Sequence, residues 1–210
     1  MTHAVAGGRP SRAVSQQISA KLVKAGAQLF LSHGYEKTTM DAVAAKAGMS
    51  KRTLYTRFPG KADLFEAVVN DVLSRTVRAL GEEHTFEGLL QDNLVAFAEN
   101  LLKSALVPDV IAVERVVTGE AKQFPELAAR LHQRFADYIV DLLSELIAHF
   151  EPKQTRPQAA VRRDAELFLA MVVLPPIRRA VLFQSKPGLH EEDRLAIRRA
   201  AEIFAKGVSA

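Results

Sequence analysis

The strongest constraint on the fold is a very short connection between two segments that have helical patterns. From residue 40 to 47, apolar side chains recur at the spacing of one helical face, and Thr39 precedes them in the position of an N-cap. Gly48 can adopt the left-handed conformation that ends a helix, and Ser50 is suited to cap a second one. With so few residues between them, the two helices must meet at a sharp angle, as in a helix-turn-helix.

The second helix of this pair has a narrow apolar side. Leu54 and Phe58 lie four residues apart and are expected to point inward. The remaining side chains are cationic, aromatic or hydroxyl-bearing: Lys51, Arg52, Thr53, Tyr55, Thr56 and Arg57. Pro59 and Gly60 end this helix, and Lys61 begins a longer one. Such a surface suits the major groove of DNA, although a solvated helical hairpin would have the same pattern.

Two flanking sequences accompany the pair of short helices. They are Leu29-Phe30-Leu31-Ser32-His33-Gly34-Tyr35 and Phe58-Pro59-Gly60-Lys61-Ala62-Asp63-Leu64-Phe65. Together with the pair, they resemble the DNA-binding domain of TetR-family transcriptional regulators over about residues 18–70. The chain departs from the family pattern at Gly26, where alanine is usual, and at Arg57, where an aromatic residue or histidine is common. The departure at Arg57 leaves the role of that side chain open.

The expected DNA contacts divide by chemistry. Hydroxyl groups, point charges and amides at helix N-termini suit phosphate oxygens, and this set comprises Thr39, Ser50, Lys51, Tyr55 and Lys61. Base edges are the expected targets of Arg52, Thr53 and Thr56, because arginine can bond guanine twice and a threonine methyl can touch thymine. For Tyr55, a core position with its hydroxyl at the rim fits equally well. For Thr39, capping and phosphate contact are compatible.

Charge is distributed unevenly along the chain. Residues 1–80 contain 12 lysines and arginines against 5 aspartates and glutamates, net +7, whereas the remainder contains 16 against 19, net −3; the whole chain is +4. A basic N-terminal part on a slightly acidic body is typical of a polyanion-binding module joined to a different one. We therefore expect a flexible basic arm at 1–14, a helix-turn-helix DNA-binding domain at 15–62, and an effector-binding and dimerisation domain at 63–210.

Helical periodicity extends along the chain without a convincing strand pattern, which predicts an all-α protein. The first helix is expected at 15–33, and a long one at 61–80 follows the two short helices. Further helices are expected at 86–106, 108–123, 125–150, 157–184 and 191–207. Pro108, Pro125 and Pro157 fit first-turn positions, where the missing N–H costs little. The family resemblance implies that the later helices form a C-terminal helical bundle.

The penultimate expected helix is apolar over more than one face. Its apolar residues are Leu167, Phe168, Met171, Val172, Leu174, Ile177, Val181 and Leu182. A second apolar face favours packing against another subunit, although a deeply buried helix would show the same pattern. The resemblance implies that the last two helices pair with a partner, so that a homodimer meets a palindromic operator. Pro175-Pro176 should kink or unwind this helix, either at a pocket or at an interface.

The resemblance also implies a ligand pocket in the bundle. Candidate lining residues are Phe97, Leu101, Val113, Arg115, His132, Phe135, Tyr138 and Phe168. They combine apolar surface with polar groups that could orient a small, largely apolar effector, but core positions or solvated faces explain each more simply. The expected function is a ligand-responsive transcriptional repressor that the effector releases from its operator. The alternative is a DNA-binding protein whose body binds a protein partner or no ligand.

Other function classes have little support. The chain contains no cysteine, which excludes disulfides, thiolate zinc sites and thiol redox sensing. His84 and His190 stand among acidic residues, but acids at a helix start are better explained by the helix dipole, so no metal or cofactor is expected. Motifs of phosphate loops, nucleophile elbows and metalloenzymes are absent, and no enzyme is expected. Without a signal peptide or an apolar run of ~18 residues, we expect a cytoplasmic protein without membrane contact.

Overall fold

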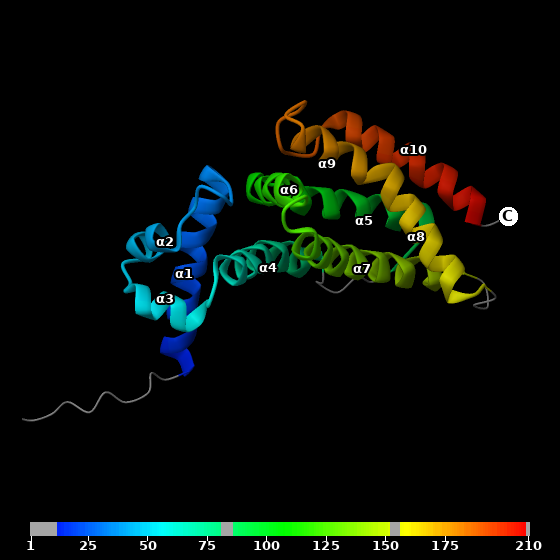
Figure 1. Ribbon diagram of the computed structural model, residues 1–210. Helices are drawn as coiled ribbons and strands as arrows, with labels where there is room; N and C mark the ends of the chain where they lie inside the picture. Colours follow the sequence, from blue (N-terminus) through cyan, green and yellow to red (C-terminus); the bar gives the residue numbers. More distant parts are fainter. Residues whose placement is uncertain (1–11, 81–85, 152–155, 209–210) are drawn as a thin grey trace, which may run out of the picture. The chain divides into compact units, whose positions relative to one another are not determined.

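The computed structural model describes residues 12–80, 86–151 and 156–208, and their regular structure is entirely helical (Figure 1). Ten α-helices and no strands occur in these ranges, which confirms the predicted all-α class. The chain divides into two compact units, one up to Asp71 and the other from Val72. Most of the predicted arm at 1–14 lies outside the described residues. No helix in the described ranges is long and apolar enough to cross a membrane.

The first unit contains three helices and the beginning of a fourth. They are α1 (Arg12–His33), α2 (Met40–Ala47), α3 (Lys51–Arg57) and α4 (Lys61–Leu80). These bounds agree with the predicted helices, except that α1 begins three residues earlier than expected. Gly34 follows α1 with a φ of 84°, a conformation that favours glycine. Local spacing and capping signals therefore located all four helices.

An aromatic cluster holds the first unit together. The rings of Phe30, Tyr35 and Phe65 have centroid separations of 5.1 to 5.7 Å, with Phe65 edge-on to the other two. All three side chains are buried, and such ring pairs add to the free energy gained by burial. Leu54 of α3 is fully buried, as predicted, whereas Phe58 is only half-buried. The single inward anchor of α3 leaves most of this short helix facing solvent.

Close packing between α1 and α4 explains the glycine at position 26. A Cβ atom at Gly26 would lie 3.2 Å from Cγ2 of Val68 and 3.4 Å from Cδ2 of Leu64. The first distance is tighter than ordinary van der Waals contact, so a side chain would press on α4. Glycine lowers the stability of an isolated helix relative to alanine, and here the close approach of α4 offsets that cost.

The second unit contains the end of α4 and six further helices. They are α5 (Leu90–Ala105), α6 (Pro108–Glu120), α7 (Pro125–His149), α8 (Gln158–Val172), α9 (Leu174–Val181) and α10 (Glu191–Val208). Pro108 and Pro125 occupy the first turns of their helices, as predicted. Pro157 instead is the N-cap of α8, one residue before the helix. α5 begins later than predicted, after Gly88, whose φ is 78°.

The predicted helix at 157–184 is two helices. α8 ends at Val172, and α9 begins at Leu174, so that Pro175 and Pro176 lie in the first turn of α9. A proline in a first turn lacks a donor that would have no partner there anyway, whereas inside a continuous helix it would remove a hydrogen bond and crowd the preceding turn. The chain therefore breaks just before the prolines, and the two segments become separate elements.

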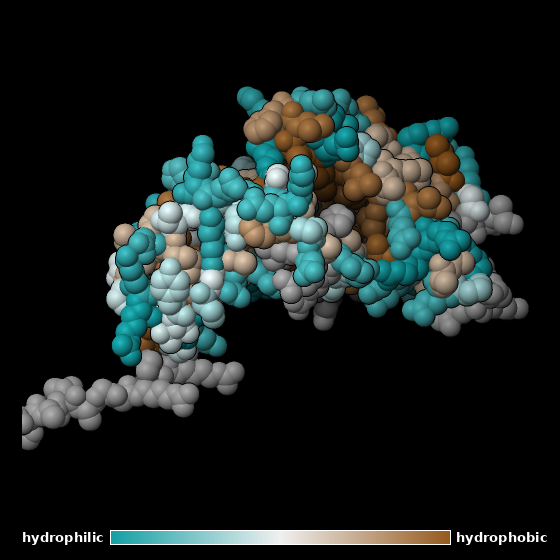
Figure 2. All heavy atoms as spheres, in the orientation of Figure 1, coloured by the Kyte–Doolittle hydropathy of each residue, from teal (hydrophilic) through white to brown (hydrophobic). Residues whose placement is uncertain are grey.

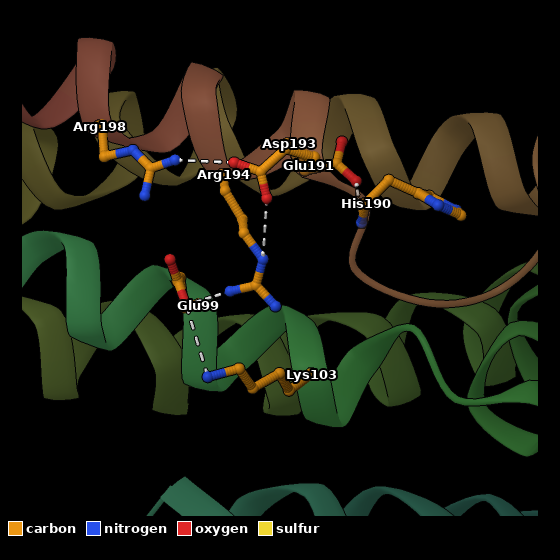
Figure 3. A network of polar contacts seen from close by, with 7 residues as sticks. All are labelled: Glu99, Lys103, His190, Glu191, Asp193, Arg194 and Arg198. Carbon is orange, nitrogen blue, oxygen red and sulfur yellow. Dashed lines mark hydrogen bonds and ion pairs between the residues drawn. The ribbon is translucent and has the colours of Figure 1, made fainter.

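One buried apolar cluster forms the core of the second unit. Its fully buried members include Leu94, Leu102, Ile111, Leu143, Ala165 and Phe168. Ion pairs join α10 to α5 at the edge of this core (Figure 3). Arg194 of α10 lies 2.5 Å from Glu99 of α5, which also contacts Lys103 at 3.4 Å. Because these groups are partly exposed, they orient the two helices more than they stabilise them.

Asp193, one of the acidic residues near His190, has a structural role at the start of α10. Its side chain is buried and accepts a hydrogen bond of 3.0 Å from the backbone N–H of His190, which places an anion at the start of α10. Asp193 also pairs with Arg179 of α9. The sequence favoured an interaction with the helix dipole over metal binding for these acids, and the hydrogen bond from His190 adds a capping role that the sequence did not predict. His84 lies outside the described residues.

Candidate nucleic-acid interface and helical body

Side-chain caps begin both α2 and α3, and Gly48 lies in the turn between them. Thr39 Oγ1 accepts a hydrogen bond of 3.2 Å from the Ala42 N–H, and Ser50 Oγ accepts one of 3.1 Å from the Thr53 N–H. Gly48 follows α2 with a φ of 64°, in the left-handed region. The predicted caps and the predicted turn are confirmed. Only three residues separate α2 from α3, and Lys51 and Arg52 at the start of α3 are exposed.

The exposed side of α3 is polar, as the spacing predicted. Lys51, Arg52, Tyr55 and Thr56 are exposed, while Thr53 is half-buried. Tyr55 exposes 47% of its surface, which excludes the core position that its aromatic ring also allowed. Thr53 Oγ1 lies 2.9 Å from Ser50 Oγ, and Thr56 Oγ1 donates to the Arg52 carbonyl oxygen at 2.7 Å. This surface offers cations, hydroxyl groups and one aromatic ring to a partner.

The three cationic side chains of α3 have different partners. Lys51 Nζ lies 2.6 Å from Asp41 Oδ2 on α2, and this hydrogen bond raises the pKa of Lys51 above its ordinary value. Arg57 donates to Ser15 Oγ on α1 at 2.5 Å, so this departure from the family pattern has a contact inside the unit. Within the described ranges, the guanidinium of Arg52 makes no hydrogen bond or ion pair. Arg52 can therefore reach outward without losing a contact.

Lys61 is the first residue of α4 and the last of the predicted phosphate contacts along the chain. Its Nζ donates to the Glu36 carbonyl oxygen at 3.0 Å and lies 4.4 Å from the centroid of the Tyr35 ring. The Tyr35 ring packs in turn on Phe65. The eight predicted DNA contacts thus belong to one unit, on or beside α2, α3 and the first residue of α4. Their contacts with DNA remain predictions.

The structure brings together only some of the predicted ligand contacts. Phe97, Leu101 and Phe168 belong to the buried cluster of the second unit, and Phe135 of α7 packs against it. Val113 is buried on α6, whereas Tyr138 on α7 is 36% exposed. His132 also belongs to α7, but its side chain lies outside the described residues. Phe97, Leu101 and Phe168 of the cluster, together with Phe135 beside it, are the predicted ligand contacts that lie at one location.

Arg115 has a structural partner that its sequence position did not reveal. Its Nε donates to the Val181 carbonyl oxygen at 3.0 Å, and its Nη2 donates to the Ala180 carbonyl oxygen at 2.5 Å. The guanidinium also lies 3.5 Å from the centroid of the Phe183 ring. Arg115 therefore caps the C-terminal end of α9, where carbonyl groups lack helical partners. No sequence signal identified this role, because α9 ends there only once the helix has broken.

A second exposed surface is apolar. Leu167, Met171 and Leu174 lie at helical spacing across the end of α8 and the start of α9 and are 45–56% exposed. On α10, Leu195 and Ile203 are 60% and 53% exposed. Figure 2 shows apolar side chains gathered on the side of the second unit where α8 and α9 lie. The sequence predicted the outer residues of α8 but missed Leu195 and Ile203, whose spacing of eight residues indicates one face.

The described residues show no arrangement for a metal. No group of three or more His, Asp or Glu side chains in these ranges is placed to hold a metal ion. The acidic side chains that do cluster are joined to arginines, as around Arg162, which contacts Asp137, Asp141 and Glu166. These groups pair α7 with α8 on the surface.

Two family models match the chain. Residues 22–68 match the model of bacterial regulatory proteins of the tetR family, and residues 92–207 match that of the AefR-like transcriptional repressor C-terminal domain. The second match alone covers more than half of the chain. The first match contains α2, α3 and the start of α4, and the second contains α6 to α9.

Similar proteins include regulators of transcription. The chain is 30% identical to an HTH-type transcriptional regulator of Mycobacterium tuberculosis over 57% of this chain and 56% of that protein, so the match spans about half of the relative. It is 26% identical to the nucleoid occlusion factor SlmA of Haemophilus influenzae over 69% and 65% of the two chains. A solved structure, the flavonoid-responsive regulator FrrA, matches 91% of this chain and 97% of its own at 28% identity, with a TM-score of 0.70.

Proposed function

The chain belongs to the TetR family of bacterial transcriptional regulators, and from this premise we propose that it is a repressor that binds a palindromic operator as a homodimer and is released by a small, largely apolar effector. The family consists of DNA-binding regulators and not of enzymes. The observation that carries the proposal is the solvent-facing side of α3, which presents Lys51, Arg52 and Tyr55 beside the capped turn. A helix of this kind can enter the major groove.

The proposed division of DNA contacts follows the partners of each side chain. Arg52 has a free guanidinium within the described ranges and is proposed to bond a guanine edge. Thr53 and Thr56 are the other proposed base contacts. Thr39, Ser50, Lys51, Tyr55 and Lys61 are proposed to contact phosphates and so to set orientation rather than sequence preference.

The apolar surface of α8, α9 and α10 supports the proposed homodimer. Leu167, Met171 and Leu174 form one exposed stripe, and Leu195 and Ile203 form another on α10, which packs beside α8. Exposed apolar side chains at helical spacing on two neighbouring helices are typical of a protein interface. A second copy would bury both stripes and supply a second recognition helix about one duplex turn away, roughly 34–36 Å.

The proposed effector is a small, largely apolar molecule. Its support is the similarity to FrrA, which is named for its response to flavonoids, and the aromatic residues of the buried cluster in the second unit. Phe135 and Tyr138, neighbours on α7 with partial exposure, are proposed to meet the ligand first. Because α4 begins in the first unit and ends in the second, it is the proposed route by which the effector shifts the population of DNA-competent dimers.

A second candidate function has one supporting observation. The similarity to SlmA, named as a nucleoid occlusion factor, covers 69% of this chain. A DNA-binding protein whose body binds a protein partner, or no ligand, would share the same helix-turn-helix. The two candidates differ in whether a small molecule alters operator affinity.

The first test is selection of bound duplexes from a random-sequence pool by the purified protein, followed by titration of the selected duplex at two salt concentrations. A palindromic sequence bound by two chains is expected, with affinity that falls as salt rises because phosphate contacts release counterions. Binding without enrichment of any sequence would refute the operator-specific function.

The second test concerns the effector. Flavonoids and other small, largely apolar compounds are screened for an increase in thermal stability, because a ligand that binds only the folded state stabilises it by mass action. A compound that raises stability is expected to weaken operator binding. The same compound should act less on Phe135→Ala, with Leu89→Ala as an exposed apolar control outside the proposed site. If no compound changes operator affinity, the second candidate function replaces the first.

A further inference from the structure

The start of α3 contains an ion pair that the DNA-binding role does not require. Asp41 lies in the first turn of α2, and Lys51 is the first residue of α3. Their Oδ2 and Nζ atoms are 2.6 Å apart, and their side chains remain 57% and 65% exposed. The pair therefore sits in solvent at the rim of the helix-turn-helix, where a phosphate group could also reach the lysine.

Lys51 is the only cationic side chain of α3 that pairs with a carboxylate within the described ranges. Arg57 donates to the hydroxyl of Ser15, and Arg52 makes no side-chain hydrogen bond or ion pair. A carboxylate and a phosphate diester offer similar anionic oxygens to an ammonium group. The residue proposed to bind phosphate thus already holds a competing anion from its own chain, whereas the residue proposed to read a base does not.

We propose that Asp41 competes with the DNA backbone for Lys51 and so limits the sequence-independent part of DNA binding, an inference that rests on the proposed DNA-binding function of α3. When Lys51 turns to a phosphate, it gives up the 2.6 Å contact or shares its charge with Asp41. The carboxylate then remains beside the phosphate, and like charges repel. Both effects weaken the contact and reduce the number of counterions that binding releases.

The consequence concerns all DNA sequences alike. A lysine–phosphate contact carries no sequence information, whereas Arg52 is proposed to contact a base edge. Removal of the Asp41 charge should therefore raise the affinity for operator and unrelated DNA by a similar factor. The ratio of the two affinities should stay constant. Asp41 thus weakens sequence-independent binding to DNA without taking part in base recognition.

The experiment compares the wild type with Asp41→Asn, Lys51→Ala and the double variant. Each protein is titrated on the selected operator and on an unrelated duplex over a range of salt concentrations. Asp41→Asn is expected to raise affinity about two- to fivefold on both duplexes, the range expected for an exposed ion pair. It should also steepen the salt dependence by up to about 0.9 in the log–log slope. In the Lys51→Ala background, the same substitution should change neither quantity.

Matched controls separate this effect from charge in general and from folding. Asp92→Asn removes an equal charge from an exposed position on α5 and should leave both affinities unchanged. Asp41→Ser, which also suits a first helical turn, should reproduce the effect of Asp41→Asn. Circular dichroism melting curves of the variants, recorded over the same range of salt concentrations, identify any loss of folded protein.

Four results would overturn the inference: lower affinity in Asp41→Asn, an equal gain in the Lys51→Ala background, a gain on only one of the two duplexes, or no change on either duplex. The first would mean that Asp41 orients Lys51 toward DNA. The second would mean that Asp41 repels the duplex directly. A wild-type protein that binds neither duplex would instead refute the proposed function itself, so the two failures are distinguishable.

Discussion

The outer faces of α3 and of α8 to α10 differ in chemistry, although both belong to amphipathic helices with a buried inner side. α3 buries Leu54 and exposes Arg52 and Tyr55. α8 buries Phe168 and exposes Leu167 and Met171. A polar, cationic outer face is stable in water and suits the binding of a hydrated polyanion. An exposed apolar stripe is unfavourable in water, and covering it with another surface lowers the free energy.

The first and second units also differ in how their helices begin. α2 and α3 have N-caps whose hydroxyl groups accept backbone hydrogen bonds, whereas α5 to α9 have no side-chain cap bond. The short helices depend on local hydrogen bonds because they bury little surface. The helices of the second unit are held by the core that they share. Substitutions should therefore act locally in the first unit and through packing or assembly in the second.

The largest expected effect is the loss of the proposed dimer when the exposed apolar side chains of α8 are replaced. Replacing Leu167 and Met171 together by glutamate should dissociate the proposed dimer, because two charges cannot be buried without partners. Operator affinity should fall more than about 100-fold, since the second half-site is no longer held by a linked subunit. Sedimentation velocity and operator titration measure the two effects. Leu89→Glu, at another exposed leucine, should leave the dimer intact. A dimer that survives the double replacement would place the interface elsewhere.

The next effect is on the polar face. Arg52→Ala should reduce operator affinity on the order of 10- to 100-fold and relax preference at one base pair, because a bidentate contact to guanine is lost. Lys51→Ala should weaken binding to all sequences alike and lower the salt slope. Repeating the duplex selection with each variant distinguishes them. Equal losses on every sequence for Arg52→Ala would exclude its proposed contact with a base.

A smaller effect tests the dependence of α3 on its cap. Ser50→Ala removes the acceptor for the Thr53 N–H and should lower the free energy of unfolding by about 1 kcal/mol, measured by denaturant titration without DNA. Ser144→Ala is the matched control, because that hydroxyl donates to the Val140 carbonyl oxygen within α7 and caps nothing. A similar loss of unfolding free energy in both variants would mean that the Ser50 cap contributes no more to stability than a hydroxyl group within a helix.

The smallest effect concerns Gly26. Gly26→Ala gains about 1 kcal/mol of helix propensity but places Cβ 3.2 Å from Cγ2 of Val68, so the net change in unfolding free energy should be near zero or slightly unfavourable. In a Val68→Ala background the contact disappears, and Gly26→Ala should then stabilise the protein. Chemical denaturation of the four proteins measures the coupling. Additive effects would refute the close approach of α1 and α4 as the reason for glycine.

The sequence predicted most of the first unit, because its signals act within a few residues. Thr39, Gly48 and Ser50 mark helix ends through bonds to backbone groups three or four residues away, and the structure confirms all three. The prediction was weaker in the second unit. The helix expected at 157–184 is α8 and α9, since the positions of Pro175 and Pro176 within a helix depend on where that helix begins.

The candidate ligand contacts in the second unit were also only partly predictable from the sequence. Phe97, Leu101 and Phe168 were candidates for the lining of a pocket that the family resemblance implies, and they share the buried cluster. Arg115 was predicted to face a ligand, but its guanidinium donates to carbonyl groups 65 and 66 residues away in the chain. No pattern in the neighbourhood of Arg115 indicates such a partner.

The sequence by itself determined the all-α class and the positions of α1 to α4, because helical period, caps and turn residues are local properties of the chain. It indicated the family only through its resemblance to the TetR-family DNA-binding domain. Only the tertiary structure decided which exposed groups are already engaged. It pairs Lys51 with Asp41, leaves the guanidinium of Arg52 without a partner in the described ranges, and exposes one apolar stripe across α8 and α9 and another on α10. These outcomes depend on which helices pack together, and packing joins residues that no short-range pattern connects.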